Sequence, residues 1–150
     1  MALELRLVSP AVSTALAELF AALRAAGDER HFHPHDLDAE TAEAVAGRSG
    51  EDLYYVAIDG DRALAYGILR GWEEGYDVPS LGIAVHPEER GSGVGRLTME
   101  LLHQAARRRG ARQIRLKVYP ENEAALRLYR SLEYVFDGEE DGQLVGRLTL

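Results

Sequence analysis

The chain has 150 residues, a formal net charge of −8 at pH 7 and no cysteine. A chain of this length can bury a core of its own, so a single domain over residues 1–150 is expected. The lack of cysteine excludes disulfides, thiolate zinc sites and a nucleophilic thiol, and the acidic balance argues against a protein that binds nucleic acid through its phosphates.

The N-terminal residues Met1 to Arg6 mix charged and apolar side chains. They match neither the apolar stretch of a signal peptide nor a membrane span. We therefore expect a soluble, cytoplasmic protein without a membrane partner.

A strand and a helix open the chain. Leu3–Leu7 alternates apolar and charged residues, which predicts a half-buried strand. Ser9 suits the N-cap and Pro10 the first position of a helix, whose apolar stripe ends at Gly27.

A second helix and a hairpin follow an irregular stretch. Asp38 or Thr41 begins the short helix, and Gly47 closes it. The Asp-Gly dipeptide tolerates the positive φ of tight hairpin turns. The next elements are two strands with their turn: Leu53–Ile58, Asp59-Gly60-Asp61 and Ala63–Leu69.

The second half alternates strands with helices and ends in a hairpin around Asp141-Gly142. Its expected elements, in chain order, are Leu81–Val85, the helix Gly93–Arg109, Ile114–Val118, the helix Asn122–Leu132, Tyr134–Phe136 and Leu144–Leu150. Hairpins together with strand-helix-strand units imply an α/β (α+β) fold with a mixed sheet and helices on both faces. Ligands of such sheets bind at the carboxyl ends of strands.

A glycine-rich turn leads from the strand that ends at Val85 into the helix that begins at Gly93. Glycines let the backbone approach a phosphate, and the helix N-terminus adds partial positive charge. The stretch Gly95-Arg96-Leu97 lacks the lysine and hydroxyl of a Walker A loop, and the glycine spacing does not match a dinucleotide fingerprint. The turn predicts another kind of anion site, or a helix that merely begins with glycines.

Two motifs define a resemblance. Arg90, Gly93 and Gly95 form Arg-x-x-Gly-x-Gly, and Asn122 to Tyr129 matches Asn-x-x-Ala-x-x-Leu-Tyr. In this order they resemble the motifs of the GNAT N-acetyltransferases, and the order of elements is similar over essentially the whole chain. The resemblance implies a mixed, mostly antiparallel twisted sheet of about seven strands, with about four helices on both faces. Leu132-Glu133-Tyr134 departs from the family's Leu-Gly-Phe and loses its turn glycine.

The resemblance also implies acetyl-CoA as cosubstrate and gives roles to residues. The Val85 N–H would polarise the acetyl carbonyl. Tyr129 would be the general acid that protonates the departing thiolate, or else a packed aromatic. Asn122 would hydrogen-bond the pantetheine or neighbouring backbone. The expected cofactor-binding residues are Ile83, Ala84, Val85, Arg90, Gly91, Ser92, Gly93, Val94, Gly95, Arg96, Asn122 and Tyr129.

The resemblance leaves the general base open. Pro79-Ser80 stands in the region where several relatives carry a glutamate. A water chain or an acid of the preceding loop could replace that glutamate, although acids in a polar loop are usually only solvated. The acidic candidates in the preceding loop are Glu73, Glu74 and Asp77.

Three imidazoles lie in His31-Phe32-His33-Pro34-His35. His33 or His35 could act as base or contact the acceptor, since imidazole titrates near neutrality. A divalent metal site and an ordinary polar loop are the alternatives. No acid follows at a recognised ligand spacing, so no metal is expected.

A basic cluster interrupts the acidic chain. It is either a solvated helix end and strand face or a means to attract an anionic cofactor. Its members are Arg107, Arg108, Arg109, Arg112, Arg115 and Lys117.

The leading hypothesis is an N-acetyltransferase in which a primary amine, on a small molecule, attacks the thioester of acetyl-CoA directly. The alternatives are protein N-terminal or lysine acetylation and a non-catalytic acyl-CoA sensor. The acidic balance would suit a cationic acceptor. Partners are then acetyl-CoA and an amine, with no nucleic acid, and exposed edge strands make a homodimer possible.

Overall fold

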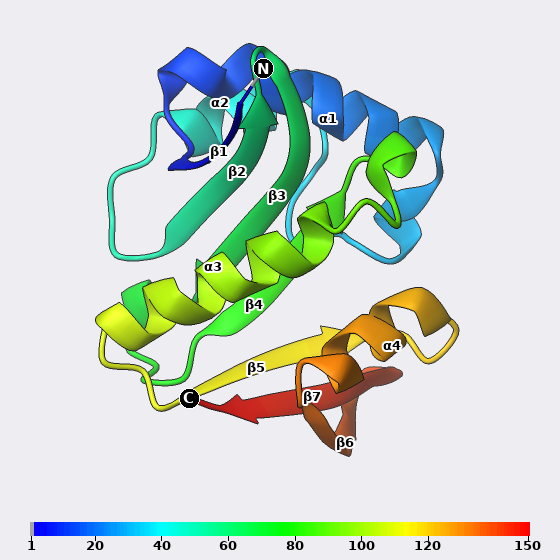
Figure 1. The fold of residues 1–150 in the computed structure, drawn as a ribbon. Helices are drawn as coiled ribbons and strands as arrows, with labels where there is room; N and C mark the ends of the chain where they lie inside the picture. Colours follow the sequence, from blue (N-terminus) through cyan, green and yellow to red (C-terminus); the bar gives the residue numbers. More distant parts are fainter. Residues whose placement is uncertain (1) are drawn as a thin grey trace.

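The computed structural model describes residues 2–150 as one seven-stranded sheet flanked by four α-helices (Figure 1). The strand order is β1-β2-β3-β4-β5-β7-β6, and β4 and β5 are its parallel neighbours while the other neighbours are antiparallel. The prediction of a mixed, mostly antiparallel sheet with helices on both faces is confirmed.

The elements agree closely with the predicted ones, except that the strand predicted at Tyr134–Phe136 is longer. The strands are β1 (Leu3–Leu7), β2 (Leu53–Asp59), β3 (Arg62–Arg70), β4 (Ser80–Val85), β5 (Gln113–Val118), β6 (Val135–Glu140) and β7 (Gln143–Thr149). The α-helices are α1 (Ser13–Ala25), α2 (Ala39–Ala46), α3 (Val94–Arg108) and α4 (Glu123–Ser131). The 3₁₀ turns are η1 (Pro10–Val12), η2 (Asp28–Arg30), η3 (Trp72–Glu74) and η4 (Pro87–Glu89).

Of the two predicted helix starts, the second is capped as expected, whereas the first α-helix begins later, at Ser13. Ser9 is the N-cap of η1 by backbone conformation, but its side chain makes no capping hydrogen bond, and η1 precedes α1. Asp38 caps α2, because its Oδ1 accepts from the Thr41 N–H at 2.8 Å. Asp38, and not Thr41, is therefore the N-cap.

The predicted turns carry left-handed backbone. Gly60 has φ 65° between β2 and β3, and Asp141 and Gly142 have φ 52° and 78° between β6 and β7. Glu133 has φ 74°, so the turn after α4 keeps the backbone that the missing glycine would adopt. A non-glycine residue pays about 1 kcal/mol for this conformation.

Hydrophobic cores lie on both faces of the sheet. Phe20 of α1 packs with Tyr66 of β3 on one face. Leu102 of α3 packs with Leu116 of β5 on the other face. Figure 1 shows α3 and α4 on the near side of the sheet. Side chains that alternate along β3, β4 and β5 therefore point into different environments.

Candidate functional site

The parallel strands β4 and β5 meet at one end and then diverge. Ser80 pairs with Arg115, whose N–H donates to the Pro79 carbonyl at 3.1 Å, and no further β4–β5 pair occurs within residues 2–150. β4 continues to Val85 and β5 to Val118, and Figure 1 shows the strands pointing apart. The opening thus lies at their carboxyl ends, where such sheets bind ligands.

The backbone of β4 presents free amides to this opening. The His86 N–H donates to the Leu64 carbonyl beside β4 at 2.8 Å. Amide directions alternate along a strand, so the N–H groups of Ile83 and Val85 point away from β3 towards β5. Ala84, between them, faces β3 with its backbone and is buried. The two edge amides can therefore pair with an extended ligand.

The glycine loop between η4 and α3 has the backbone that its sequence predicts. Gly91 and Gly93 have φ values of 79° and 92°, which other residues rarely adopt. Gly95 lies against β4, since a Cβ built on it would be 3.2 Å from Val85 Cγ2. The loop thus places the start of α3 directly beside the end of β4.

Free backbone donors gather at the N-terminus of α3. The Val94 N–H donates to Ser92 Oγ at 3.4 Å, whereas the amides of Gly95 and Arg96 have no acceptor in the described chain. The first-turn amides of a helix have no intrahelical partner, and the helix dipole adds partial positive charge. This arrangement can bind a phosphate group.

The arginine side chains of the loop are held by other elements. Arg90 forms an ion pair with Asp28 of η2. Arg96 donates to the Ser131 hydroxyl at the end of α4. The loop is therefore fastened to both faces of the molecule, and phosphate binding falls mainly to its backbone amides.

Tyr129 of α4 carries a phenol on a buried side chain. It is 7% exposed, and its ring centroid lies 5.9 Å from that of Tyr134. Burial raises the pKa of its phenol to about 12, so the hydroxyl stays protonated at neutral pH. That hydroxyl has no hydrogen-bond partner among residues 2–150.

Asn122 stands at the N-terminus of the same helix. Its Oδ1 accepts from the Ala125 N–H at 3.4 Å, which makes it the N-cap of α4. The predicted contact with neighbouring backbone is thus present. Its amide nitrogen makes no hydrogen bond to the described residues.

The segment between α1 and α2 reaches the end of β5. His33 Nε2 lies 2.9 Å from Tyr119 Oη, and the His31 ring lies 6.0 Å from that of Tyr119. Tyr119 directly follows β5. His33 is exposed, and its Nδ1 has no partner in the described structure. The pair thus places two groups that can pass a proton at the end of β5.

His35 is used inside the fold. Its Nδ1 lies 2.7 Å from the Asp36 carbonyl and its Nε2 lies 2.9 Å from the Tyr66 hydroxyl. A carbonyl only accepts, so Nδ1 carries the proton and Nε2 accepts from Tyr66. Burial lowers the pKa of His35. With both nitrogens engaged, His35 has a packing role, and His33 is the imidazole open to a ligand.

A cavity of about 260 Å³ lies beneath this histidine segment. No acidic side chain of the described residues lines it, whereas three cationic ones do. Its lining residues are His31, Phe32, His33, Pro34, Ile68, Arg70, Ser80, Leu81, Gly82, Arg115, Leu116, Lys117 and Gln143.

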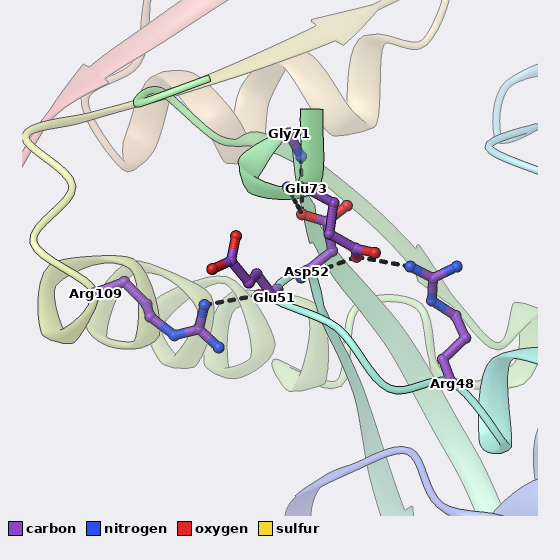
Figure 2. Close-up of polar contacts among 6 residues, drawn as sticks. All are labelled: Arg48, Glu51, Asp52, Gly71, Glu73 and Arg109. Carbon is purple, nitrogen blue, oxygen red and sulfur yellow. Dashed lines mark hydrogen bonds and ion pairs between the residues drawn. The ribbon is translucent and has the colours of Figure 1, made fainter. Parts of the chain in front are cut away.

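Glu73, a predicted alternative base, belongs to a polar network at the amino end of β4 (Figure 2). Its Oε2 accepts from Arg48 at 2.7 Å and from the Asp52 N–H at 3.0 Å. Asp52 Oδ1 in turn accepts from the amides of Gly71 and Glu73. The Asp52 amide, together with Arg48, holds the pKa of Glu73 below its usual range. The carboxylate is thus engaged away from the opening.

The remaining candidates from the sequence do not form a site in the part of the chain that the structure describes. Glu74 and Asp77 are exposed and do not line the cavity. Within residues 2–150, no three His, Asp or Glu side chains converge as a metal-ligand set. No helix there is both long enough and apolar enough to cross a membrane.

Comparison with known proteins agrees with this geometry. The model of the acetyltransferase (GNAT) family matches residues 15–134. The chain therefore belongs to the acetyltransferase (GNAT) family, whose members use acetyl-CoA.

The matches to curated relatives are partial. Streptothricin acetyltransferase of Streptomyces lavendulae is 30% identical over 108 residues, which cover 70% of this chain and 56% of that protein. An acetyltransferase of Pectobacterium atrosepticum is 31% identical over 84 residues, which cover 55% of this chain and 57% of that protein. The matched regions thus span somewhat more than half of these relatives.

Solved structures share the fold over its whole length. A GCN5-related N-acetyltransferase from Kribbella flavida is 26% identical with a TM-score of 0.80, covering 99% of this chain and 98% of that one. The PaiA N-acetyltransferase of Thermoplasma acidophilum, solved in complex with coenzyme A, has a TM-score of 0.81 at 12% identity and covers 100% of both chains. At that identity the second likeness shows the fold alone.

Two features of the opening were missed by sequence reasoning. Tyr119 carries no motif, and its contact with His33 joins residues 86 positions apart. Arg70 reads as the polar end of a strand, yet it lines the cavity. Neither feature has a local signal in the sequence, because both depend on contacts between segments that are far apart in the chain.

Proposed function

We propose that residues 1–150 form a single domain that transfers the acetyl group of acetyl-CoA to a primary amine by direct attack of that amine. The observation that carries this proposal is the divergence of β4 and β5 beyond Ser80 and Arg115. It exposes an edge of free amides beside the phosphate-binding start of α3. Membership of the acetyltransferase (GNAT) family supports the same activity.

Backbone groups bind the cosubstrate. The amides of Gly95 and Arg96 take the pyrophosphate, in a loop whose shape Gly91 and Gly93 permit. The pantetheine arm lies along the Ile83–Val85 edge and pairs with it as an added strand would. The free amide nitrogen of Asn122 is a further donor on the β5 side.

Two hydrogen-bond donors act on the thioester. The Val85 N–H donates to the acetyl oxygen, where negative charge develops as the amine attacks, and the Ile83 N–H faces the same way. The Tyr129 hydroxyl donates its proton to the sulfur as the C–S bond breaks and the C–N bond forms. Its raised pKa keeps that proton in place at neutral pH. Coenzyme A then leaves as the thiol, and water carries the proton that the newly acetylated nitrogen loses back to Tyr129.

His33 and Tyr119 accept the proton of the amine. An amine attacks only with its lone pair free, so its extra proton must leave. The Tyr119 hydroxyl takes that proton while it passes its own to His33 Nε2 across 2.9 Å. Glu73 does not serve, because its Oε2 is bound by Arg48 and the Asp52 amide at the amino end of β4. His35 does not serve, because both its nitrogens are engaged within the fold.

The size of the cavity favours a small acceptor. About 260 Å³ lies near the lower end of the range of small-ligand sites. A protein N-terminus or lysine is the alternative acceptor, and an acyl-CoA sensor without catalysis is the alternative class.

Calorimetric titration with acetyl-CoA tests the cosubstrate site. We expect a micromolar Kd for the wild type and loss of binding in Gly93→Val, because a β-branched residue does not tolerate φ 92°. Circular dichroism checks that the variant is folded. Equal affinity of the two proteins would contradict the proposed role of the loop.

Coenzyme A release with small amines and with peptides then tests catalysis, and mass spectrometry of the product identifies the acetylated nitrogen. Turnover on small amines supports the proposal, and turnover on peptides alone identifies a protein acetyltransferase. Binding without turnover on any amine would identify a sensor. A cytoplasmic location and a homodimer stay predictions. The homodimer is suggested by β1, an edge strand of the sheet whose Leu3 and Leu7 are 41% and 52% exposed.

A further inference from the structure

A row of cationic side chains crosses the sheet at the base of the opening. The register aligns Arg70 with Ser80, Ser80 with Arg115, and Arg115 with Arg147, across β3, β4, β5 and β7. Residues aligned in this way project from the same face of a sheet, about 4.8 Å from strand to strand. Lys117 lies two residues beyond Arg115 and therefore shares that face.

Like charges placed directly opposite one another destabilise a sheet unless anions compensate them. Glu140 is the carboxylate within ion-pair distance of this row in the described chain, at 2.7 Å from Arg115 and 3.8 Å from Lys117. The hydrogen bond from Arg115 holds the pKa of Glu140 below its usual range. One carboxylate thus pairs with two of the four cations, in a chain whose net charge is −8.

The guanidinium groups retain hydrogen-bonding capacity. Arg115 Nε is buried and has no hydrogen-bond partner in the described structure. Arg70 donates from Nη1 to the Pro34 carbonyl at 3.1 Å, and no carboxylate of residues 2–150 pairs with it. Both side chains line the cavity, together with Lys117. The cavity wall therefore offers forked, charged donors.

We propose that the amine acceptor is a small molecule that also carries a carboxylate, which Arg70 and Arg115 bind at the base of the β4–β5 opening. This inference rests on the proposed acetyl transfer. Arginine forks match a carboxylate with two parallel, charge-assisted hydrogen bonds. An ammonium accepts none, and a carboxamide offers one neutral oxygen. The positive field of the cavity thus favours an amine that also carries a carboxylate. The net charge of the chain had led us to expect a cationic acceptor instead.

The test compares L-amino acids with their carboxamides and with the corresponding amines that lack the carboxyl group. We expect kcat/KM for coenzyme A release to be about 10- to 100-fold higher for the acids, because a hydrogen bond to a charged group contributes that much. Arg115→Gln should raise KM for the acids by a similar factor. Arg112→Gln, an exposed arginine just before β5 and outside the cavity, should leave it unchanged.

A second variant separates binding from damage to the fold. Glu140→Gln removes the carboxylate that competes for Arg115, so KM for the acids should fall. Structural damage would raise KM in both variants. Equal kcat/KM for acids and carboxamides would overturn the proposal, and so would acetylation of acidic peptides without turnover of free amino acids.

Binding without acetyl-CoA distinguishes this inference from the proposed function. N-acetyl amino acids and their carboxamides are titrated into the protein by calorimetry. If the protein binds the acids more tightly than the carboxamides, and Arg115→Gln abolishes that binding, the carboxylate site is supported. This holds even if no amine is turned over and the proposed transfer fails. Turnover of amines without acid selectivity would retain the transfer and overturn the carboxylate site.

Discussion

Gly95 of α3 lies so close to Val85 of β4 that a β-carbon on Gly95 would be 3.2 Å from Val85 Cγ2. Gly95→Ala should therefore push the first turn of α3 away from β4 and lower the affinity for acetyl-CoA several-fold. Unfolding free energy should change little, because a gain of about 1 kcal/mol in helix propensity offsets a similar packing cost. Calorimetry and urea unfolding measure the two quantities. Val85→Ala in the same chain makes room and should restore affinity; an unrestored double variant would contradict the contact.

Tyr129→Phe removes a hydroxyl that no described residue uses and keeps the packed ring. We expect kcat to fall about 100-fold, as for loss of a general acid, while the Kd for acetyl-CoA stays at the wild-type value. Rapid-quench measurement of product and calorimetry separate these effects. An unchanged kcat would remove Tyr129 from the mechanism.

His33→Gln and Tyr119→Phe each break the 2.9 Å contact across the opening. Because the two groups pass one proton, we expect each change to lower kcat about 10- to 100-fold and the double variant to be no slower than either. His35→Gln is the matched control, since the nitrogens of His35 face Asp36 and Tyr66. Where this variant folds as the wild type does, it should keep wild-type acetyl-CoA binding and turnover. Additive losses in the double variant would argue against a shared proton path.

Glu73→Gln tests whether that carboxylate is structural or catalytic. It weakens the hydrogen bonds from Arg48 and the Asp52 amide that connect the loop before β2 to η3 (Figure 2). Thermal unfolding should shift to lower temperature while kcat remains that of the wild type. Loss of kcat at unchanged stability would instead make Glu73 the base.

His103 makes stability depend on pH. It is 6% exposed, with Nε2 2.8 Å from Tyr134 Oη, and burial, followed by the charge of Arg107, lowers its pKa to about 4. An unfolded histidine titrates near 6.5, so the unfolded chain binds more protons between these values. Unfolding free energy is therefore highest above pH ~6.5 and falls by up to about 3 kcal/mol as pH drops from ~6.5 to ~4.

Urea unfolding at several pH values measures this slope. His103→Gln keeps a neutral hydrogen-bonding side chain and should flatten it. His35, whose pKa is also lowered, should leave a smaller slope of the same sign. A slope unchanged by His103→Gln would show that His103 titrates alike in both states.

Most elements were predictable because their signals are local. The Asp-Gly turns, the Asp38 cap and the amphipathic stripe of α3 each depend on residues within a few positions of one another. The glycine loop was predictable for the same reason, since its strand, turn and helix are contiguous. β6 was predicted too short because its charged residues lack the apolar alternation of a half-buried strand.

The sequence by itself determined the family motifs, the order of elements and the backbone of the glycine loop that we propose binds phosphate, because glycines and helix starts act through their own peptide groups. The tertiary structure alone decided which side chains meet in the opening. His33 meets Tyr119 through a side-chain contact between residues 86 positions apart. Strand pairing aligns Arg70, Ser80, Arg115 and Arg147 in one row. Strand register depends on packing over the whole sheet, so no local pattern in the sequence predicts this row of cations or the charge of the cavity that it lines.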